Sequence, residues 1–331
     1  MNLLSPLIRQ YALVVTVNLA ILTSGMSIAW PSPSLVKLQN PIDTPLSRPI
    51  TVEEGSWIVS SGYLLASVTC VFGGMFIDTI GRKNCILLVT IPKFFMAIFL
   101  IFANEVWMFI LCRAVMNVID SFLLIVVPIY VSEIASKDHR GALGTILQLF
   151  SSIGTLFSLS VGPFLPYSTF SIVYAGVLAV ATVPLLFLPE TPFHMYSKGR
   201  LVEAMRILKR IRNTDVQAKQ ELEDYVIFSD EKKKKLDKSA LFKNKTFLKA
   251  LSLSILLSVG TQAIGINCVN FYLQTIMEAS NTSLPSEVGS VIVGAIQILA
   301  CVGTTLIMNL FRRRTILLSS LIGFFIGMVS A

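Results

Sequence analysis

Nine long apolar stretches occupy most of the chain and constrain its fold more than any other feature. They lie at about residues 11–30, 57–78, 84–103, 107–132, 143–163, 169–188, 248–277, 287–310 and 315–331. A stretch of roughly 20 apolar residues spans the hydrocarbon of a bilayer as an α-helix, because lipid offers no water to satisfy an irregular backbone. The sequence therefore predicts an all-α polytopic membrane protein.

The composition agrees with this class and argues against others. Hydrophobic residues make up 54% of the chain, charged residues make up 14%, and the mean hydropathy is +0.73, which is not expected of a water-soluble domain. The net charge of +8 comes from Lys and Arg between the apolar stretches, so we expect a bilayer and no nucleic acid as partner. The five cysteines form no Cys-x-x-Cys pair, so we expect no disulfide framework and no metal site.

Positive residues are divided unevenly between the two sets of loops. Lys and Arg follow the second, fourth, sixth and eighth stretches, whereas the opposite loops hold only two. By the positive-inside rule, the first set of loops and the N-terminus lie in the cytoplasm. This orientation predicts that Trp30, Trp57 and Trp107 lie at the outer interface and that the Pro-rich segment 31–56 is an ordered outer loop.

A polar segment at 193–246 separates the first six apolar stretches from the last three. Its first part, SKGRLVEAMRILKRIR, places Leu201 and Leu208 on one helical face, so we expect short amphipathic helices on the cytoplasmic surface. The chain then divides into an N-terminal six-helix bundle at 1–192, this linker, and a partial C-terminal bundle of three helices at 247–331.

The turn between the second and third stretches carries a motif, GMFIDTIGRK at 74–83. Asp78 ends one helix, Gly81 lets the backbone turn where a side chain would obstruct it, and Arg82 places a positive charge beside the membrane. The motif resembles the signature turn of the major facilitator superfamily. A weaker copy without the acid, GTTLIMNLFRRRT at 303–315, predicts two repeated bundles.

Further motifs occur in the order and approximate spacing of the sugar porters of that superfamily. They are PIYVSEIA at 128–135, Arg140-Gly-Ala-Leu, Gln148, Pro189-Glu-Thr-Pro and Gly265-Ile-Asn267. Within the family, SGMSIAWPSPSL and VGAIQILA are similar to segments of arthropod facilitated trehalose transporters. The resemblance implies a twelve-helix major facilitator fold of which nine helices are present, so we expect a chain truncated at its C-terminus.

Neutral amides in the apolar stretches are the candidate substrate site. A sugar presents hydroxyls that donate and accept hydrogen bonds, and an amide does both without a charge to desolvate. The resemblance implies sugar contacts for four of them: Gln148, Gln262, Asn267 and Gln297. The alternative is that these amides only hold helices together. Glycines beside the span-seven amides would let that helix unwind, and Asn270 and Tyr272 correspond to gate positions or are packing residues.

Charged residues at the cytoplasmic level form a second candidate set. The resemblance implies a conformational latch that holds the inner gate shut, formed by Asp78, Gly81, Arg82, Arg113, Glu133, Arg140 and Glu190. Exposed ion pairs contribute only roughly 0–1 kcal/mol each, so such a latch works through the number of its contacts. The alternative is a solvated surface facing lipid headgroups. Phe193 departs from the family, which usually has Arg there.

Asp120 lies near the middle of the fourth apolar stretch, where a carboxylate needs water or a partner. Arg113 lies seven residues away on the same face, which makes a water-bridged pair conceivable. Asp120 is interpreted either as a proton-coupling acid or as a paired or protonated structural acid, and the second interpretation is favoured. Proton-coupled sugar porters usually carry an Asp in the first span, and residues 11–30 contain no acid.

The favoured function is transport of a neutral sugar, trehalose or a hexose, across the plasma membrane by facilitated diffusion through alternating access. The alternatives are a truncated non-transporting or sugar-sensing membrane protein and a proton-coupled sugar symporter. We expect no enzyme and no cofactor, because the sequence has no nucleophile with a base and no Gly-rich phosphate loop. The two histidines, His139 and His194, lie in cytoplasmic turns and are expected at the surface. The oligomeric state is left open.

Overall fold

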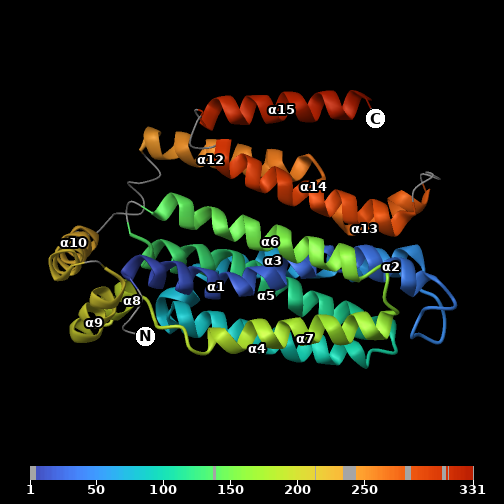
Figure 1. The fold of residues 1–331 in the computed structure, drawn as a ribbon, viewed down its shortest axis with the longest axis horizontal. Coiled ribbons are helices and arrows are strands. Elements are labelled where there is room, and N and C mark those ends of the chain that lie inside the picture. Colours follow the sequence, from blue (N-terminus) through green and yellow to red (C-terminus); the bar gives the residue numbers. More distant parts are fainter. Residues whose placement is uncertain are drawn as a thin grey trace.

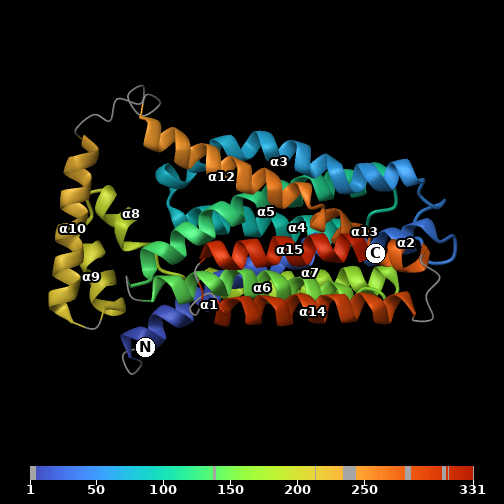
Figure 2. The ribbon, with the colours of Figure 1, turned by 90° about the horizontal axis from the view of Figure 1, so that it is seen from above.

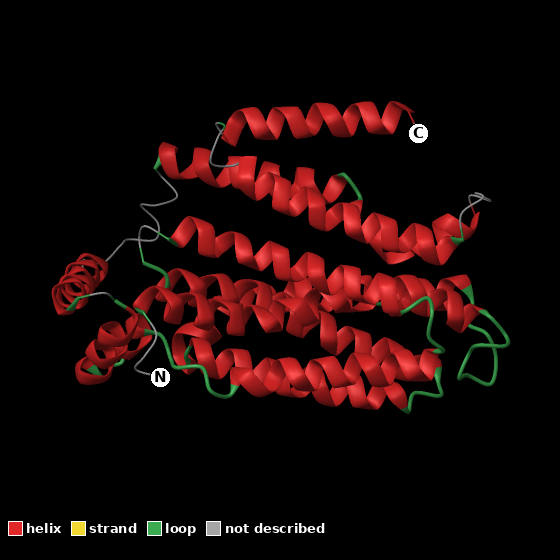
Figure 3. Ribbon diagram, in the orientation of Figure 1, coloured by secondary structure: helices red, strands yellow, loops and turns green. Residues whose placement is uncertain are grey.

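A computed structural model describes residues 5–136, 139–212, 214–233, 244–279, 285–307, 311 and 313–330. These residues form helices and loops, without a strand among them (Figure 3). The weaker copy of the turn motif, near Asn309 and Arg312, and the chain end at Ala331 lie outside the described residues. The predicted all-α class is confirmed.

Fourteen helices make up the described structure (Figure 1). Their bounds are α1 Pro6–Ala29, α2 Pro31–Gln39, α3 Val52–Ile80, α4 Arg82–Ile101, α5 Val106–Ile134, α6 Arg140–Val161, α7 Tyr167–Leu185, α8 Pro192–Ser197, α9 Leu201–Ile211, α10 Asp215–Lys233, α12 Lys245–Ala263, α13 Ile266–Ala279, α14 Ser286–Ile307 and α15 Arg313–Ser330. Each of the nine predicted apolar stretches coincides with one of these helices or, for 248–277, with the pair α12 and α13.

The described helices divide by length and apolar character. Seven helices or continuous helix pairs are long and apolar enough to cross a membrane, and α3 makes an eighth if its two halves, bent by 61°, count as one span. The described apolar stretch of α15 is shorter, at Arg314–Gly327. The short helices α8, α9 and α10 lie at one end of the long bundle, beside the N-terminus, as expected for a linker on one membrane face (Figure 1).

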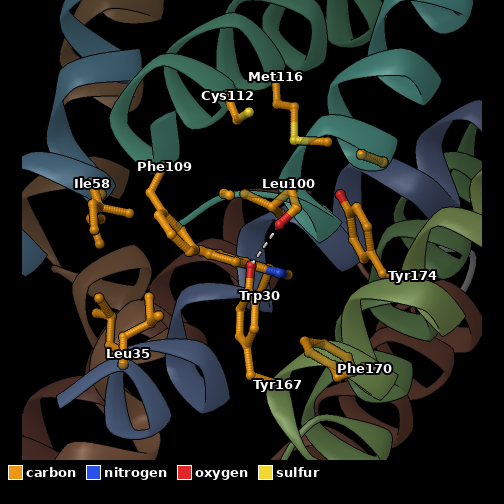
Figure 4. Packing of buried hydrophobic residues seen from close by; sticks show 14 of the residues in the cluster. Trp30, Leu35, Ile58, Leu100, Phe109, Cys112, Met116, Tyr167, Phe170 and Tyr174 are labelled. Carbon is orange, nitrogen blue, oxygen red and sulfur yellow. Dashed lines mark hydrogen bonds between the residues drawn. The ribbon is translucent and has the colours of Figure 1, made fainter. Parts of the chain in front are cut away.

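Helices α1 and α3–α7 pack into one bundle around two apolar clusters. One cluster, near α2, is built around large aromatic side chains, including Trp30, Phe109, Tyr167 and Tyr174 (Figure 4). The other, toward the linker, is mostly aliphatic and encloses Tyr130. Local caps define the helix ends: Thr51 and Glu54 form a capping box at the start of α3.

Helices α1 and α6 approach each other so closely that two glycines are required. A Cβ added to Gly25 would overlap the carbonyl oxygen of Ser151, and one added to Gly154 would overlap that of Leu22. The α6 hydroxyls of Thr155 and Ser158 donate to α1 carbonyls at 3.3 and 3.0 Å. Small residues that let backbones approach and hydroxyls that bond across helices are how membrane bundles hold together without a hydrophobic driving force.

Two features at the α2 end of the bundle differ from what the sequence indicated. Trp30 is fully buried and packs edge-on against Tyr167, whereas Trp57 and Trp107 are about half exposed. Residues 31–39 form the helix α2 and not a loop, because Pro31 suits the first helical position and the chain continues from α1 through Trp30, whose φ and ψ angles are helical.

Candidate functional site

The first part of the candidate site lies where the seventh span breaks. Helix α12 ends at Ala263, Gly265 takes a φ of +77°, and α13 begins at Ile266. A positive φ is readily adopted only by glycine, so Gly265 is the residue that permits the break. Across it the Asn267 side chain donates to Oε1 of Gln262 at 2.9 Å. The expected interruption of this span is therefore observed, and it brings two of the predicted amides together.

A second amide pair joins α13 to α14. Nε2 of Gln297 donates to Oδ1 of Asn270 at 2.7 Å, and Asn270 is buried. Tyr272, two residues further along α13, has non-helical φ and ψ angles of −113° and 16° and marks a kink. Asn270 and Tyr272 thus lie near the distortions of α13, and Gln297 lies on the neighbouring helix α14. Broken helices of this kind line the substrate sites of many transporters.

Gln148 comes from the opposite side, on α6, and its side chain is exposed. Helix α14 runs alongside α6, and its Gly294 packs against Leu156 and Leu159 (Figure 1 and Figure 2). The two amide pairs and Gln148 therefore lie on α6, α12, α13 and α14, helices that belong to both halves of the chain. Each paired amide keeps further donor or acceptor capacity for a hydroxylated ligand.

Contacts between the two halves are concentrated near α2. Helix α13 packs on α2, with the Gln274 backbone N–H donating to the Ser32 hydroxyl at 3.0 Å. The rings of Tyr63 on α3 and Phe271 on α13 lie 5.4 Å apart. In contrast, none of the residues of α12 is buried. The described halves are thus closely packed at the α2 end, and α12 lies open at the other.

Asp120 pairs with a lysine that the sequence interpretation overlooked. Its Oδ1 lies 2.5 Å from Nζ of Lys93 on α4 and accepts a 2.7 Å hydrogen bond from the Ser24 hydroxyl on α1. Lys93 is 1% exposed and also donates to Thr23 at 3.1 Å. The anticipated pairing of Asp120 with Arg113 is replaced by this ion pair. A single lysine inside the otherwise uncharged stretch 84–103 was the signal that could have found it.

Arg113 lies in the core of the first bundle, apart from the joint between α3 and α4. It is 1% exposed, its guanidinium stacks 5.0 Å from the Trp30 ring centre, and Nη1 donates to the Ser27 hydroxyl at 3.0 Å. A guanidinium over an indole face is a favourable cation–π contact, strongest where water is excluded. Arg113 is therefore separate from the other residues predicted for the latch.

The remaining latch candidates cluster at the joint between α3 and α4. Arg82 forms ion pairs with Asp78 at 3.2 Å and with Glu133 on α5 at 3.0 Å. The Glu190 carboxylate accepts from the backbone N–H groups of Arg82 and Lys83 at 3.0 and 3.1 Å, so it caps the start of α4, where the helix dipole favours an anion.

Two further residues show how tightly this joint is packed. Gly81 has a φ of +103°, and a Cβ there would lie 2.6 Å from Oε2 of Glu190. Arg140 begins α6 and is exposed, and in the described part of the chain no ion pair links it to Glu133 or Glu190.

Phe193 and His194 of α8 complete this cluster. The Arg82 guanidinium lies 5.9 Å from the Phe193 ring centre. Phe193, at a position where the family usually has Arg, therefore offers Arg82 an aromatic ring and not a second positive charge. His194 is 4% exposed, which corrects the expected surface position, and its Nδ1 lies 3.1 Å from Nη1 of Arg82. Burial, as the largest cause, lowers the pKa of His194 from its ordinary value of 6.5.

The linker docks on the same end of the first bundle. Arg212, after α9, forms a two-pronged ion pair with Glu221 at 2.5 and 2.7 Å and donates to the carbonyl of Ile134 at 2.8 Å. Gln10 of α1 donates to the Ile211 carbonyl at 2.6 Å and accepts from the Ser136 N–H at 3.0 Å. The side chains of Gln10 and Arg212 thus join α9 to the first bundle, and the Arg212–Glu221 pair ties α10 to the same place.

Comparisons with known proteins show which family the chain is similar to. The family described as "Sugar (and other) transporter" matches residues 36–331. The chain is 27% identical to the facilitated trehalose transporter Tret1 of Polypedilum vanderplanki over 310 residues, which cover 93% of this chain and 61% of that relative. It is also 27% identical to the human solute carrier family 2, facilitated glucose transporter member 6, over 89% of this chain and 58% of that relative. The chain thus spans about three-fifths of the length of the curated relatives it matches.

Solved structures share the fold at lower identity. The partially occluded inward open conformation of the xylose transporter XylE from E. coli superposes with a TM-score of 0.72 at 18% identity, covering 92% of this chain and 74% of that one. XylE bound to 6-bromo-6-deoxy-D-glucose gives a TM-score of 0.74 at 18% identity, covering 92% and 70%. These similarities establish a major facilitator fold for the matched part of the chain.

Proposed function

Because this chain belongs to the sugar transporter family, we propose that it moves a neutral sugar across the plasma membrane by facilitated diffusion. Trehalose and a hexose are the candidate substrates, since the named relatives include trehalose and glucose transporters. The observation that carries the proposal is the set of amides at the break of the seventh span. Gln262, Asn267, Asn270 and Gln297 form two hydrogen-bonded pairs there, and Gln148 lies on α6 of the other half.

The transport cycle we propose is alternating access between two bundles. The first bundle at 1–192 would rock against the part that begins at 247, with 193–246 as a cytoplasmic linker and the N-terminus in the cytoplasm. Close packing of α13 on α2 supports an arrangement in which the outer end is closed. The same orientation puts the cluster around Arg82 at the inner end, where it would act as the latch.

Uptake of radiolabelled trehalose and glucose into proteoliposomes tests this proposal. Gln262→Ala and Gln148→Ala are each expected to lower uptake at least tenfold, because each removes a hydrogen-bond partner of the bound sugar, and a sugar hydroxyl left unpaired in the site costs about 1–3 kcal/mol. Gln220→Ala, in an exposed position on α10, serves as the matched control and should leave uptake unchanged.

The amount of reconstituted protein must be equal for all variants. Unchanged uptake in both site variants would refute the site assignment. If the unaltered protein showed no uptake while sugar changed protease cleavage of the 193–246 linker, a sensing function would replace transport.

We also expect uptake to be independent of a proton gradient. Asp120 is engaged by Lys93 and Ser24, so it is not poised as a free proton acceptor, and α1 contains no acid. Dissipating a pH gradient with a protonophore should therefore leave both the rate and the final sugar distribution unchanged. Accumulation of sugar against its gradient with an acidic exterior would instead favour the proton-coupled alternative.

A further inference from the structure

His194 occupies an unusual place for a titratable residue, inside the cluster around Arg82. Helix α8 begins after Thr191, whose hydroxyl accepts from the His194 N–H at 3.4 Å, so the ring is held against the α3–α4 joint. Its Nε2 faces Gly81, where an added Cβ would lie 2.9 Å away. Its Nδ1 lies 3.1 Å from Nη1 of Arg82.

The chemistry of this contact determines the protonation of the ring. A guanidinium can only donate hydrogen bonds, so Nδ1 of His194 must accept, which requires that Nδ1 carries no proton. A protonated ring would place two donors and two positive charges against each other at 3.1 Å. The Arg82 contact therefore exists only with neutral His194.

The other partners of Arg82 show what this contact adds. Nε and Nη2 are engaged by Glu133 at 3.1 and 3.0 Å, and Nη2 also contacts Asp78 at 3.2 Å. Nη1 has only a long contact of 3.4 Å with the Ile77 carbonyl besides His194. The imidazole thus accepts from Nη1, the one guanidinium nitrogen for which the carboxylates provide no close acceptor.

We propose that neutral His194 is a positioning residue for Arg82, and that protonation of its ring loosens the cluster at the inner end of the first bundle. This inference deepens the proposed function and rests on it where it assigns the cluster to a latch. The signal it would read is a proton arriving from the cytoplasmic side.

Burial and the charges that face His194 from each neighbouring element determine the direction in which its pKa shifts. Burial and the cations Arg82 on α4 and Lys198 after α8 lower the pKa, while Glu190 before α8 and Asp78 on α3 raise it, and the net pKa lies below 6.5. Glu133 of α5 acts through Arg82. A released ring regains its ordinary pKa, so the intact cluster is fully stable above pH 6.5 and loses stability as the pH falls below that value.

The test uses the full chain in lipid nanodiscs without any sugar, so that its outcome is independent of transport. Because His139 and His194 are the only histidines, two ring signals are expected in a histidine NMR titration, and His139→Asn assigns them. We expect His194 to titrate below its ordinary pKa of 6.5. A His194 pKa at or above 6.5 would overturn the proposal.

Hydrogen exchange at the start of α4 supplies the second readout. Exchange of the Arg82 and Lys83 amides, which donate to Glu190, is compared at each pH with His194→Asn, whose side-chain oxygen can accept near the Nδ1 position without titrating. Relative to this variant, opening should increase as the pH falls from 7.5 to 5.5, because only the protein that keeps the imidazole loses stability when the ring is protonated. Equal pH dependence in both proteins would contradict a role for the ring.

Discussion

Replacing Lys93 by methionine is expected to lower the free energy of unfolding by about 3–5 kcal/mol, the usual cost of removing one partner of a buried ion pair. Lys93 is 1% exposed and is the only described side chain that forms an ion pair with Asp120. Without it, the carboxylate would keep the Ser24 hydroxyl alone on Oδ1, and Oδ2 has no described partner. Thermal unfolding in detergent, followed by aggregation or circular dichroism, measures the effect.

The double variant Lys93→Met/Asp120→Asn shows whether the loss comes from the pair. Removing both charges should recover most of the stability, because replacing a buried pair by neutral groups is often nearly neutral. Lys83→Met, on the partly exposed start of the same helix, is the matched control and should change little. Additive losses in the double variant would mean that the two charges are not energetically coupled.

The second large effect is expected at the contact between α1 and α6. Gly154→Ala should destabilise the first bundle by about 3 kcal/mol or more, the upper end of the overpacking range, because the obstructing atoms belong to the α1 backbone and cannot rotate away. The added methyl would overlap the Leu22 carbonyl oxygen and approach the Met26 amide nitrogen to 2.8 Å. Thermal stability and the monodisperse fraction on size exclusion provide the readout.

Two further glycines sharpen this prediction. Gly25→Ala meets the Ser151 carbonyl from the other side of the same contact and should have a similar effect. Gly176→Ala on α7 meets nothing within 4 Å, and because alanine has the higher helix propensity it should be neutral or slightly stabilising. If all three variants had equal stability, close α1–α6 packing would not be a determinant of the fold.

The features that could be predicted from the sequence are those that depend on residues close together in the chain. Apolar length predicts each of the long helices, and Gly265 predicts the break beside Asn267, because a positive φ is a local requirement. The turn motif likewise predicts the sharp reversal at Gly81 and the Asp78–Arg82 pair, since these residues are one helical turn apart.

The features that sequence reasoning missed depend on contacts between distant elements. Nothing near Asp120 indicates that its partner is Lys93 on another helix, and an argument from spacing alone selects Arg113 on the same one. The position of Trp30 in the sequence indicates an interfacial residue, whereas in the structure its ring packs against Arg113 and Tyr167, which come from other helices. His194 looks like a surface residue because burial by the α3–α4 joint is a tertiary event.

The account is tested most directly by equilibrium binding of radiolabelled trehalose and glucose to the purified chain in nanodiscs. We predict saturable binding of at least one sugar, a loss of at least tenfold in affinity in Gln262→Ala, and unchanged affinity in Gln220→Ala, an exposed amide on α10. Binding that is saturable but equally strong in Gln262→Ala would contradict the assignment of the site to the amides at the α12–α13 break.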